Sequence, residues 1–194
     1  MKMIALFFIM ALGLPNYSYE QSTPGLETAL ARKFPADSKE EGRWVFYAYK
    51  ANIRKVDKPT VKACIPNYDL YQVDLTNYLG YHIYQGTCLV LFDSARDNIR
   101  LVEPIWYSGR DKAFNELFLG QKFGTKDSLL NFLVELGQLR QIGSGYKFRL
   151  TSNADSLNTY NLEYFNRDTD TTGGNATSST IRIDIKDLTI VKIR

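Results

Sequence analysis

Residues 87–92 (Thr-Cys-Leu-Val-Leu-Phe) constrain the fold of this chain more than any other stretch, because they are almost wholly apolar and β-prone. Turn-forming and charged residues follow at 93–98, and a second β-rich run follows at 99–107. Two such runs around a short polar break predict an antiparallel hairpin. The first run has no polar face, so we expect a central strand that is covered on both sides. Pro104 cannot donate a ladder hydrogen bond, which predicts an edge or a bulge in the second run.

The first 18 residues are typical of a secretory signal peptide. Lys2 precedes a short apolar run at 3–14, and Ser18 offers a small side chain for cleavage. The run is too short to span a bilayer comfortably. The alternatives are a retained membrane anchor or a buried helix. The sequence therefore predicts a secreted or periplasmic protein with no stable membrane anchor after cleavage, in which residues 19–194 form a single extracytoplasmic domain.

Charge and motifs limit the classes of function. The chain has 24 Lys and Arg against 21 Asp and Glu. This near balance argues against a nucleic-acid partner, which would need a concentrated basic face. No P-loop, dinucleotide fingerprint or metalloprotease helix motif is present, so no cofactor is expected.

Apolar residues recur at helical spacing in three stretches, at 26–34, 111–119 and 129–139. Capping side chains at 125–128 precede the third stretch, and Gly143 follows it. The spacing therefore predicts two adjacent amphipathic helices at about 111–142. Helices in this position after a hairpin are expected to pack on one face of a sheet.

Strands are predicted where polar and apolar residues alternate or where aromatic residues gather. These stretches are 44–49, 68–75, 146–150, 160–164 and 181–185. The phase of the last run changes at Lys186 and Asp187, where we expect a bulge or a bend. The basic stretch 50–62 is expected to be a loop or a weak edge, and 77–85 has no clear assignment. The fold class is α+β, with one mainly antiparallel sheet.

Two cysteines, Cys64 and Cys88, are present. In an exported protein an oxidised pair is the default expectation. A disulfide would tie residues 62–66 to the first strand of the hairpin. The alternative is two separate buried thiols.

His82 is the only histidine, so any Ser-His-Asp or Cys-His arrangement has to use it. No Gly-x-Ser-x-Gly motif surrounds a serine. The alternative is a tucked or surface histidine. A carboxylate-pair hydrolase would need two acids in one cleft, for which Glu103 and Asp93 are the best placed. The alternative, which the composition of protein surfaces favours, is that each acid is a solvated or ion-paired surface group.

Residues 168–175 partly resemble the first half of a calcium loop. Asp168 and Asp170 would be the oxygen ligands, but Ser179 stands where such a loop has its Glu. The alternative is a solvated hairpin tip, and no other metal site is predicted.

Tyrosine is abundant, with 13 residues, and a cluster follows the basic stretch. Exposed Tyr beside Lys or Arg makes a platform for sugars, peptides or anionic glycans. The alternative is that the rings fill the core. The members are Tyr68, Tyr71, Tyr78, Tyr81 and Tyr84.

The sequence thus favours a non-enzymatic binding protein for an unknown protein or glycan partner. The candidate ligand-binding residues are Tyr78, Tyr81, His82 and Tyr84. The alternative function is a small hydrolase that acts on envelope or glycan material through acidic residues and His82.

Overall fold

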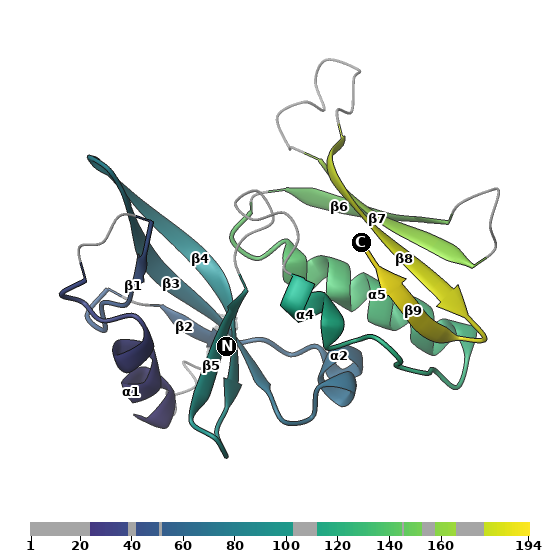
Figure 1. Ribbon diagram of the computed structural model, residues 1–194, viewed down its shortest axis with the longest axis horizontal. Coiled ribbons are helices and arrows are strands. Elements are labelled where there is room, and N and C mark those ends of the chain that lie inside the picture. The colour runs from purple at the N-terminus through teal and green to yellow at the C-terminus, as the bar shows by residue number, and fades with distance from the viewer. Residues whose placement is uncertain are drawn as a thin grey trace, which may run out of the picture.

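The computed structural model describes residues 24–38, 42–50, 52–102, 112–144, 146–152, 158–165 and 177–194. It confirms the α+β class, with antiparallel sheets and a few helices (Figure 1). The strands, which were expected in one sheet, form two sheets. The predicted signal peptide, Glu103, Pro104, Asp168 and Asp170 all lie outside the described residues.

The N-terminal half contains a five-stranded antiparallel sheet with the order β1-β3-β4-β5, in which β2 also pairs with β3. We call it the N-terminal sheet. Helix α1 lies beside it (Figure 1). The elements are α1 (Pro24–Lys33), β1 (Trp44–Val45), β2 (Ile53–Lys55), α2 (Pro59–Cys64), β3 (Asp69–Leu79), β4 (His82–Asp93) and β5 (Asn98–Val102).

The C-terminal half contains a four-stranded antiparallel sheet with the order β6-β7-β8-β9, which we call the C-terminal sheet. Helix α5 runs beneath it (Figure 1). The elements are α4 (Lys112–Glu116), α5 (Lys126–Arg140), β6 (Lys147–Ser152), β7 (Thr159–Phe165), β8 (Thr177–Lys186) and β9 (Thr189–Ile193).

Strand β4 is central and buried on both faces along its second half, as its apolar run predicts. Alternate side chains point to opposite faces of a strand. Val90 and Phe92 therefore pack in a smaller core with α1 residues such as Leu30, whereas Leu89 and Leu91 pack in a larger core. The β4–β5 hairpin is confirmed, with Asp93 opposite Asn98.

The larger core joins both sheets through α5. Helix α5 buries Phe132, Leu133 and Leu136 completely, which confirms the helical spacing read from the sequence. These side chains cluster with Leu89 of the N-terminal sheet and Ile183 of the C-terminal sheet. Each such side chain contributes roughly 1.5–3 kcal/mol when it leaves water.

Thr125 begins α5 with a capping box. Its side chain accepts a hydrogen bond from the Ser128 backbone N–H at 3.1 Å, and the Ser128 hydroxyl accepts one from the Thr125 N–H at 3.2 Å. The cap satisfies two backbone donors that the first turn of a helix leaves open. The predicted capping role of residues 125–128 is therefore confirmed.

Two tight turns explain stretches that the sequence pattern left open. Residues 77–85 continue β3 and β4 around a two-residue turn at Gly80 and Tyr81, where Gly80 has φ +58°. Asp187 and Leu188 both have positive φ, at 50° and 60°, as the two-residue turn between β8 and β9 requires. The phase change at Lys186 is thus the end of a strand, and the ladder is also irregular just before it.

The expected disulfide between Cys64 and Cys88 is wrong, because the two cysteines are not bonded to each other. Cys88 lies in the smaller core, on the α1 side of the N-terminal sheet. Cys64 on α2 packs against the larger core, on the other side. Burial, with a smaller contribution from the charge of Glu135, raises the pKa of Cys64 to about 11.

Two further stretches differ from expectation. The aromatic run at 44–49 keeps strand pairing only at Trp44 and Val45, and then turns. The basic stretch 50–62 contains β2 and the start of α2, which is more regular structure than expected. Within the described part of the chain, no helix has both the length and the apolar character needed to cross a membrane.

Candidate functional site

The turn end of the β3–β4 hairpin, residues 74–87, carries an exposed run at residues 80–85. Strands β3 and β4 pair without interruption from Asp69 opposite Phe92 to Leu79 opposite His82. Strand β5 pairs with β4 only from Leu89 to Asp93. The hairpin therefore extends beyond β5 and away from the C-terminal sheet (Figure 1). We call residues 74–87 the hairpin end.

The four predicted ligand-binding residues all lie at the hairpin end, but not on one face. Tyr81 sits at the turn and is fully exposed. His82 and Tyr84 are exposed on one face, with ring centroids 6.1 Å apart. Tyr78 pairs with Ile83, so it points to the opposite face and is half-buried. The structure thus brings His82 and Tyr84 together and separates Tyr78 from them.

The other two tyrosines of the cluster belong to the cores. Tyr71 is buried in the smaller core, and Tyr68 packs against the larger one. For these two residues the core-filling alternative is correct.

Tyr78 joins a second aromatic group that follows β1. Its hydroxyl lies 2.6 Å from that of Tyr47 in a hydrogen bond. The Tyr49 ring lies 5.7 Å from the Tyr47 ring, and the Lys50 Nζ lies 5.6 and 5.3 Å from the centroids of the two rings. The hydrogen bond to Tyr78, followed by partial burial, raises the pKa of Tyr47, so its hydroxyl stays protonated. The ammonium group over the rings is a cation–π contact.

A groove of about 210 Å³ lies beside Tyr47 on the sheet face that carries Tyr78. Asp74 and Thr87 stand opposite each other in the ladder, and the Thr87 hydroxyl donates to Asp74 Oδ1 at 2.7 Å. The polar groups thus converge beside an aromatic wall, an arrangement that orients a small polar ligand. The full lining is Tyr47, Lys50, Asp74, Leu75, Thr76, Gln85, Gly86 and Thr87.

Comparison with known protein families, curated proteins and solved structures finds no match to this chain. The site is therefore argued from its own geometry.

Sequence reasoning missed most of the groove. The signal was present in Gly80 and Tyr81, which form a Gly-x turn between two β-prone runs. Once this turn is placed, Asp74 pairs with Thr87, and position 76 pairs with position 85. Tyr47 has no such signal, because its position depends on the turn that ends β1.

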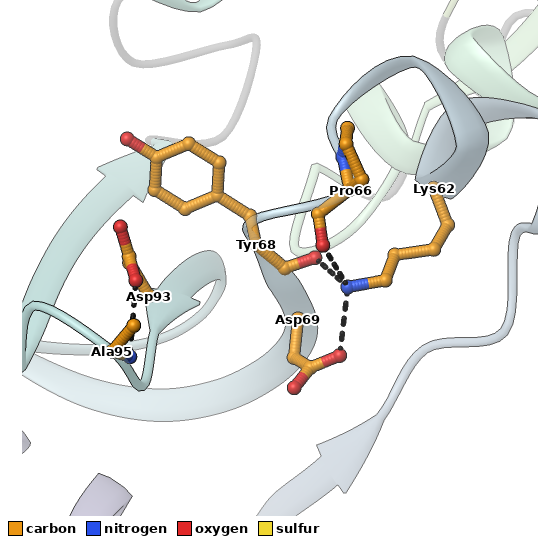
Figure 2. Close-up of polar contacts among 6 residues, drawn as sticks. All are labelled: Lys62, Pro66, Tyr68, Asp69, Asp93 and Ala95. Carbon is orange, nitrogen blue, oxygen red and sulfur yellow. Dashed lines mark hydrogen bonds and ion pairs between the residues drawn. The ribbon is translucent and has the colours of Figure 1, made fainter.

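A second polar cluster lies at the opposite end of β3 (Figure 2). Lys62 Nζ donates to the backbone oxygens of Pro66 and Tyr68, at 3.0 and 2.5 Å, and lies 3.0 Å from Asp69 Oδ1. Three acceptors around one ammonium group hold the end of α2 against the start of β3. The cluster is best explained as a structural contact.

Asp93, one of the two acids considered for hydrolysis, is 3% exposed and caps the β4–β5 turn. Its Oδ1 accepts hydrogen bonds from the backbone N–H groups of Ala95 and Arg96, at 3.1 and 3.2 Å, and Figure 2 shows the first of these. The Asp93 carboxylate therefore holds the turn through these hydrogen bonds.

The chemistry of His82 is limited by its place at the hairpin end. Among the described residues, no hydrogen bond or ion pair joins it to a carboxylate, and its ring contact is with Tyr84. The described ranges also contain no group of three or more His, Cys, Asp or Glu side chains that could hold a metal ion.

Proposed function

We propose that this chain is an exported, non-enzymatic protein that binds a neutral glycan in the groove of the hairpin end. The observation that carries the proposal is the combination of the Tyr47 ring with the polar side chains of Asp74, Gln85 and Thr87 in one groove. Export rests on the apolar N-terminal stretch of the sequence, whose residues 1–18 have the pattern of a signal peptide.

The groove suits the two kinds of surface that a sugar ring offers. A sugar has an apolar face, which an aromatic ring can cover, and an edge of hydroxyl groups, which need donors and acceptors. Tyr47 supplies the ring. The Asp74 carboxylate accepts, the Gln85 amide donates and accepts, and the Thr87 hydroxyl, whose proton is donated to Asp74, accepts. The volume of about 210 Å³ lies below the ~300 Å³ of a drug-sized site, so it suits one sugar unit of a longer chain.

Charge favours a neutral glycan over an anionic one. Asp74 places a carboxylate in the groove and would repel a sulfated or carboxylated chain at close range. Lys50 balances that charge at the rim, where its Nζ already lies over two tyrosine rings.

The test is binding of the purified protein to immobilised neutral oligosaccharides of glucose, mannose and N-acetylglucosamine, with heparin as the anionic comparison. We expect retention by a neutral oligosaccharide. Tyr47→Ala should weaken that binding by about tenfold or more through loss of ring contact, whereas Tyr47→Phe keeps the ring and should retain most of it. Calorimetry gives the affinities.

The matched control is Val191→Ala, because Val191 is a half-exposed apolar residue on β9, in the other sheet. It should leave binding unchanged. Loss of glycan binding in both Tyr47→Ala and Val191→Ala would point to general destabilisation. Capture of an envelope protein that depends on Tyr81 and Tyr84, without retention of any oligosaccharide, would replace the glycan by a protein partner.

A further inference from the structure

In the described part of the chain, the outer edge of β4 has no partner strand along residues 82–87. On its inner edge β4 pairs with β3 along its whole length, but on its outer edge β5 pairs only from Leu89 onwards. Among the residues that the structure describes, none pairs with the outer edge along residues 82–87. At ~3.4 Å per residue this stretch is about 20 Å long.

The register shows which backbone groups face outwards. Leu79 and His82 flank a two-residue turn, so they form a hydrogen-bonded pair. Such pairs alternate along an antiparallel ladder, so every second residue of β4 from His82 turns its N–H and C=O towards β3. Ile83, Gln85 and Thr87 therefore present their N–H and C=O groups outwards.

The sequence of this edge has none of the side chains that normally block the addition of a strand. Proteins protect such edges with Lys, other charges, Pro or bulges. Residues 81–88 (Tyr-His-Ile-Tyr-Gln-Gly-Thr-Cys) contain no Lys, Arg, Asp, Glu or Pro, and their pairing with β3 is free of bulges. Ile83 is 65% exposed beside the fully exposed Tyr81. This edge is therefore a template for a further strand.

We propose that the edge pairs with the same edge of a second copy, antiparallel and about a two-fold axis through Gln85. Gln85 would then face Gln85 of the other copy, and Ile83 would face Thr87. All three outward-facing residues of each copy would take part, which gives about six backbone hydrogen bonds. The same register places Tyr84 opposite Gly86, a glycine that also lies against the Trp44 ring of its own copy.

Two features of the strand favour a second copy over another partner. An antiparallel two-fold pair needs an open edge as long as the strand that enters it. This edge meets the condition, because the outward-facing residues Ile83 and Thr87 lie two residues on either side of Gln85, so the two-fold axis brings each against the other. Residues 82–87 also contain no Lys, Arg, Asp or Glu, so the paired segments bring no like charges together.

The pairing does not depend on the glycan proposal, but it has a consequence for it. The two-fold axis of an antiparallel ladder is perpendicular to the sheet, so opposite residues share a face. The two grooves would therefore lie side by side on one face of a continuous sheet. A longer glycan that reaches both grooves would bind the dimer with higher affinity than it binds a single groove.

The test is the mass of the purified full chain in solution, measured by light scattering across a range of concentrations. The wild type should be a dimer. Gln85→Lys and Gln85→Glu each place like charges at the axis and should weaken dimerisation by about tenfold or more. Mixed in equal amounts, the two variants should form a heterodimer, which also shows that both are folded.

The matched control is Val191→Lys, which adds the same charge to β9, the outer strand of the C-terminal sheet. It should leave the dimer intact. A monomeric wild type at all concentrations would overturn the proposal, and so would a dimer that survives Gln85→Lys or dissociates in Val191→Lys. Failure of the two Gln85 variants to associate when mixed would overturn the register.

Discussion

The Glu135 carboxylate of α5 accepts a hydrogen bond from the Val61 backbone N–H of α2 at 3.0 Å. The same oxygen accepts one from Thr60 at 2.9 Å. Backbone donors in the first turn of a helix have no partner within the helix, and a carboxylate there is also favoured by the helix dipole. One side chain thus fixes α2 of the N-terminal half to the long helix of the C-terminal half.

Glu135→Ala should therefore lower the free energy of unfolding by about 1.5–3 kcal/mol, because it leaves these two donors without their charged acceptor. Glu135→Gln keeps an acceptor oxygen and loses the charge, so it should cost less. Urea unfolding of the two variants measures the difference. Equal stability of Glu135→Ala and the wild type would show that the contact contributes nothing.

Gly137 in α5 allows β6 to lie against the helix. A Cβ atom at this position would lie 2.4 Å from the Phe148 ring, which is closer than real contacts allow. Gly137→Ala should therefore destabilise the protein by about 1–3 kcal/mol through overpacking, although Ala favours helices by about 1 kcal/mol. Thermal unfolding tests this expectation.

Gly124→Ala is the control for that substitution, because a Cβ at Gly124 meets nothing within 4 Å. It should change stability by less than about 0.5 kcal/mol. If Gly137→Ala proved as stable as Gly124→Ala, the close approach of Phe148 to the helix would be wrong.

The two cysteines should stay reduced and resist modification in the folded state. Cys88 is fully buried, and the raised pKa of Cys64, at about 11, keeps its thiol protonated at neutral pH. Iodoacetamide at pH 7 should therefore label neither cysteine quickly before unfolding and both in guanidinium. A protein mass two hydrogens below the reduced value would instead show the disulfide that the separated side chains exclude.

The stability of the C-terminal sheet should fall in acid. Hydrogen bonding from Arg149 at 2.7 Å outweighs partial burial and holds the pKa of Glu163 below its ordinary value. A carboxyl group with a lowered folded-state pKa stabilises the fold above its unfolded pKa, and this contribution is lost as the pH falls through the folded value. Since the pair is partly exposed, Glu163→Gln should cost only about 0.5 kcal/mol at neutral pH.

Urea unfolding at neutral and acid pH tests whether Glu163 stabilises the fold at neutral pH and loses this effect in acid. The difference between Glu163→Gln and the wild type should be largest at neutral pH and disappear in acid. Glu116→Gln is the control, because Glu116 Oε1 lies 4.0 Å from Lys112 Nζ on an exposed helix face. A constant difference at every pH would show that the Glu163 effect is not electrostatic.

Local patterns predicted much of the fold because each depends on neighbours in sequence. The apolar run that contains Leu89 and Val90 predicted a strand covered on both faces, and the Thr125 cap predicted the start of α5. The pairing of Cys64 and Cys88 depends on which face of the sheet each side chain occupies. The position of Cys64 in the sequence does not show on which face of the sheet its helix will pack.

The division of the strands into two sheets was not predicted for the same reason, because it depends on contacts between residues that are far apart in the sequence. Residues that alternate, such as those of β5 and β6, look alike whether their strands are neighbours or lie in different sheets. The candidate site was also predicted only in part. The aromatic cluster in the sequence indicated Tyr81, His82 and Tyr84, and the structure places these residues at an exposed hairpin end. Tyr47 is joined to the site by its hydrogen bond with Tyr78, which lies 31 positions further along the chain. No local sequence pattern predicts such a contact.

The most direct test of the account is a nuclear magnetic resonance titration of the labelled protein with the neutral oligosaccharide that binds it best. The account predicts that amide shifts change at Tyr47, Asp74, Gln85 and Thr87, and not on the C-terminal sheet. Changes centred instead on the second polar cluster, around Lys62 and Asp69, or no change with any oligosaccharide of the panel, would contradict it.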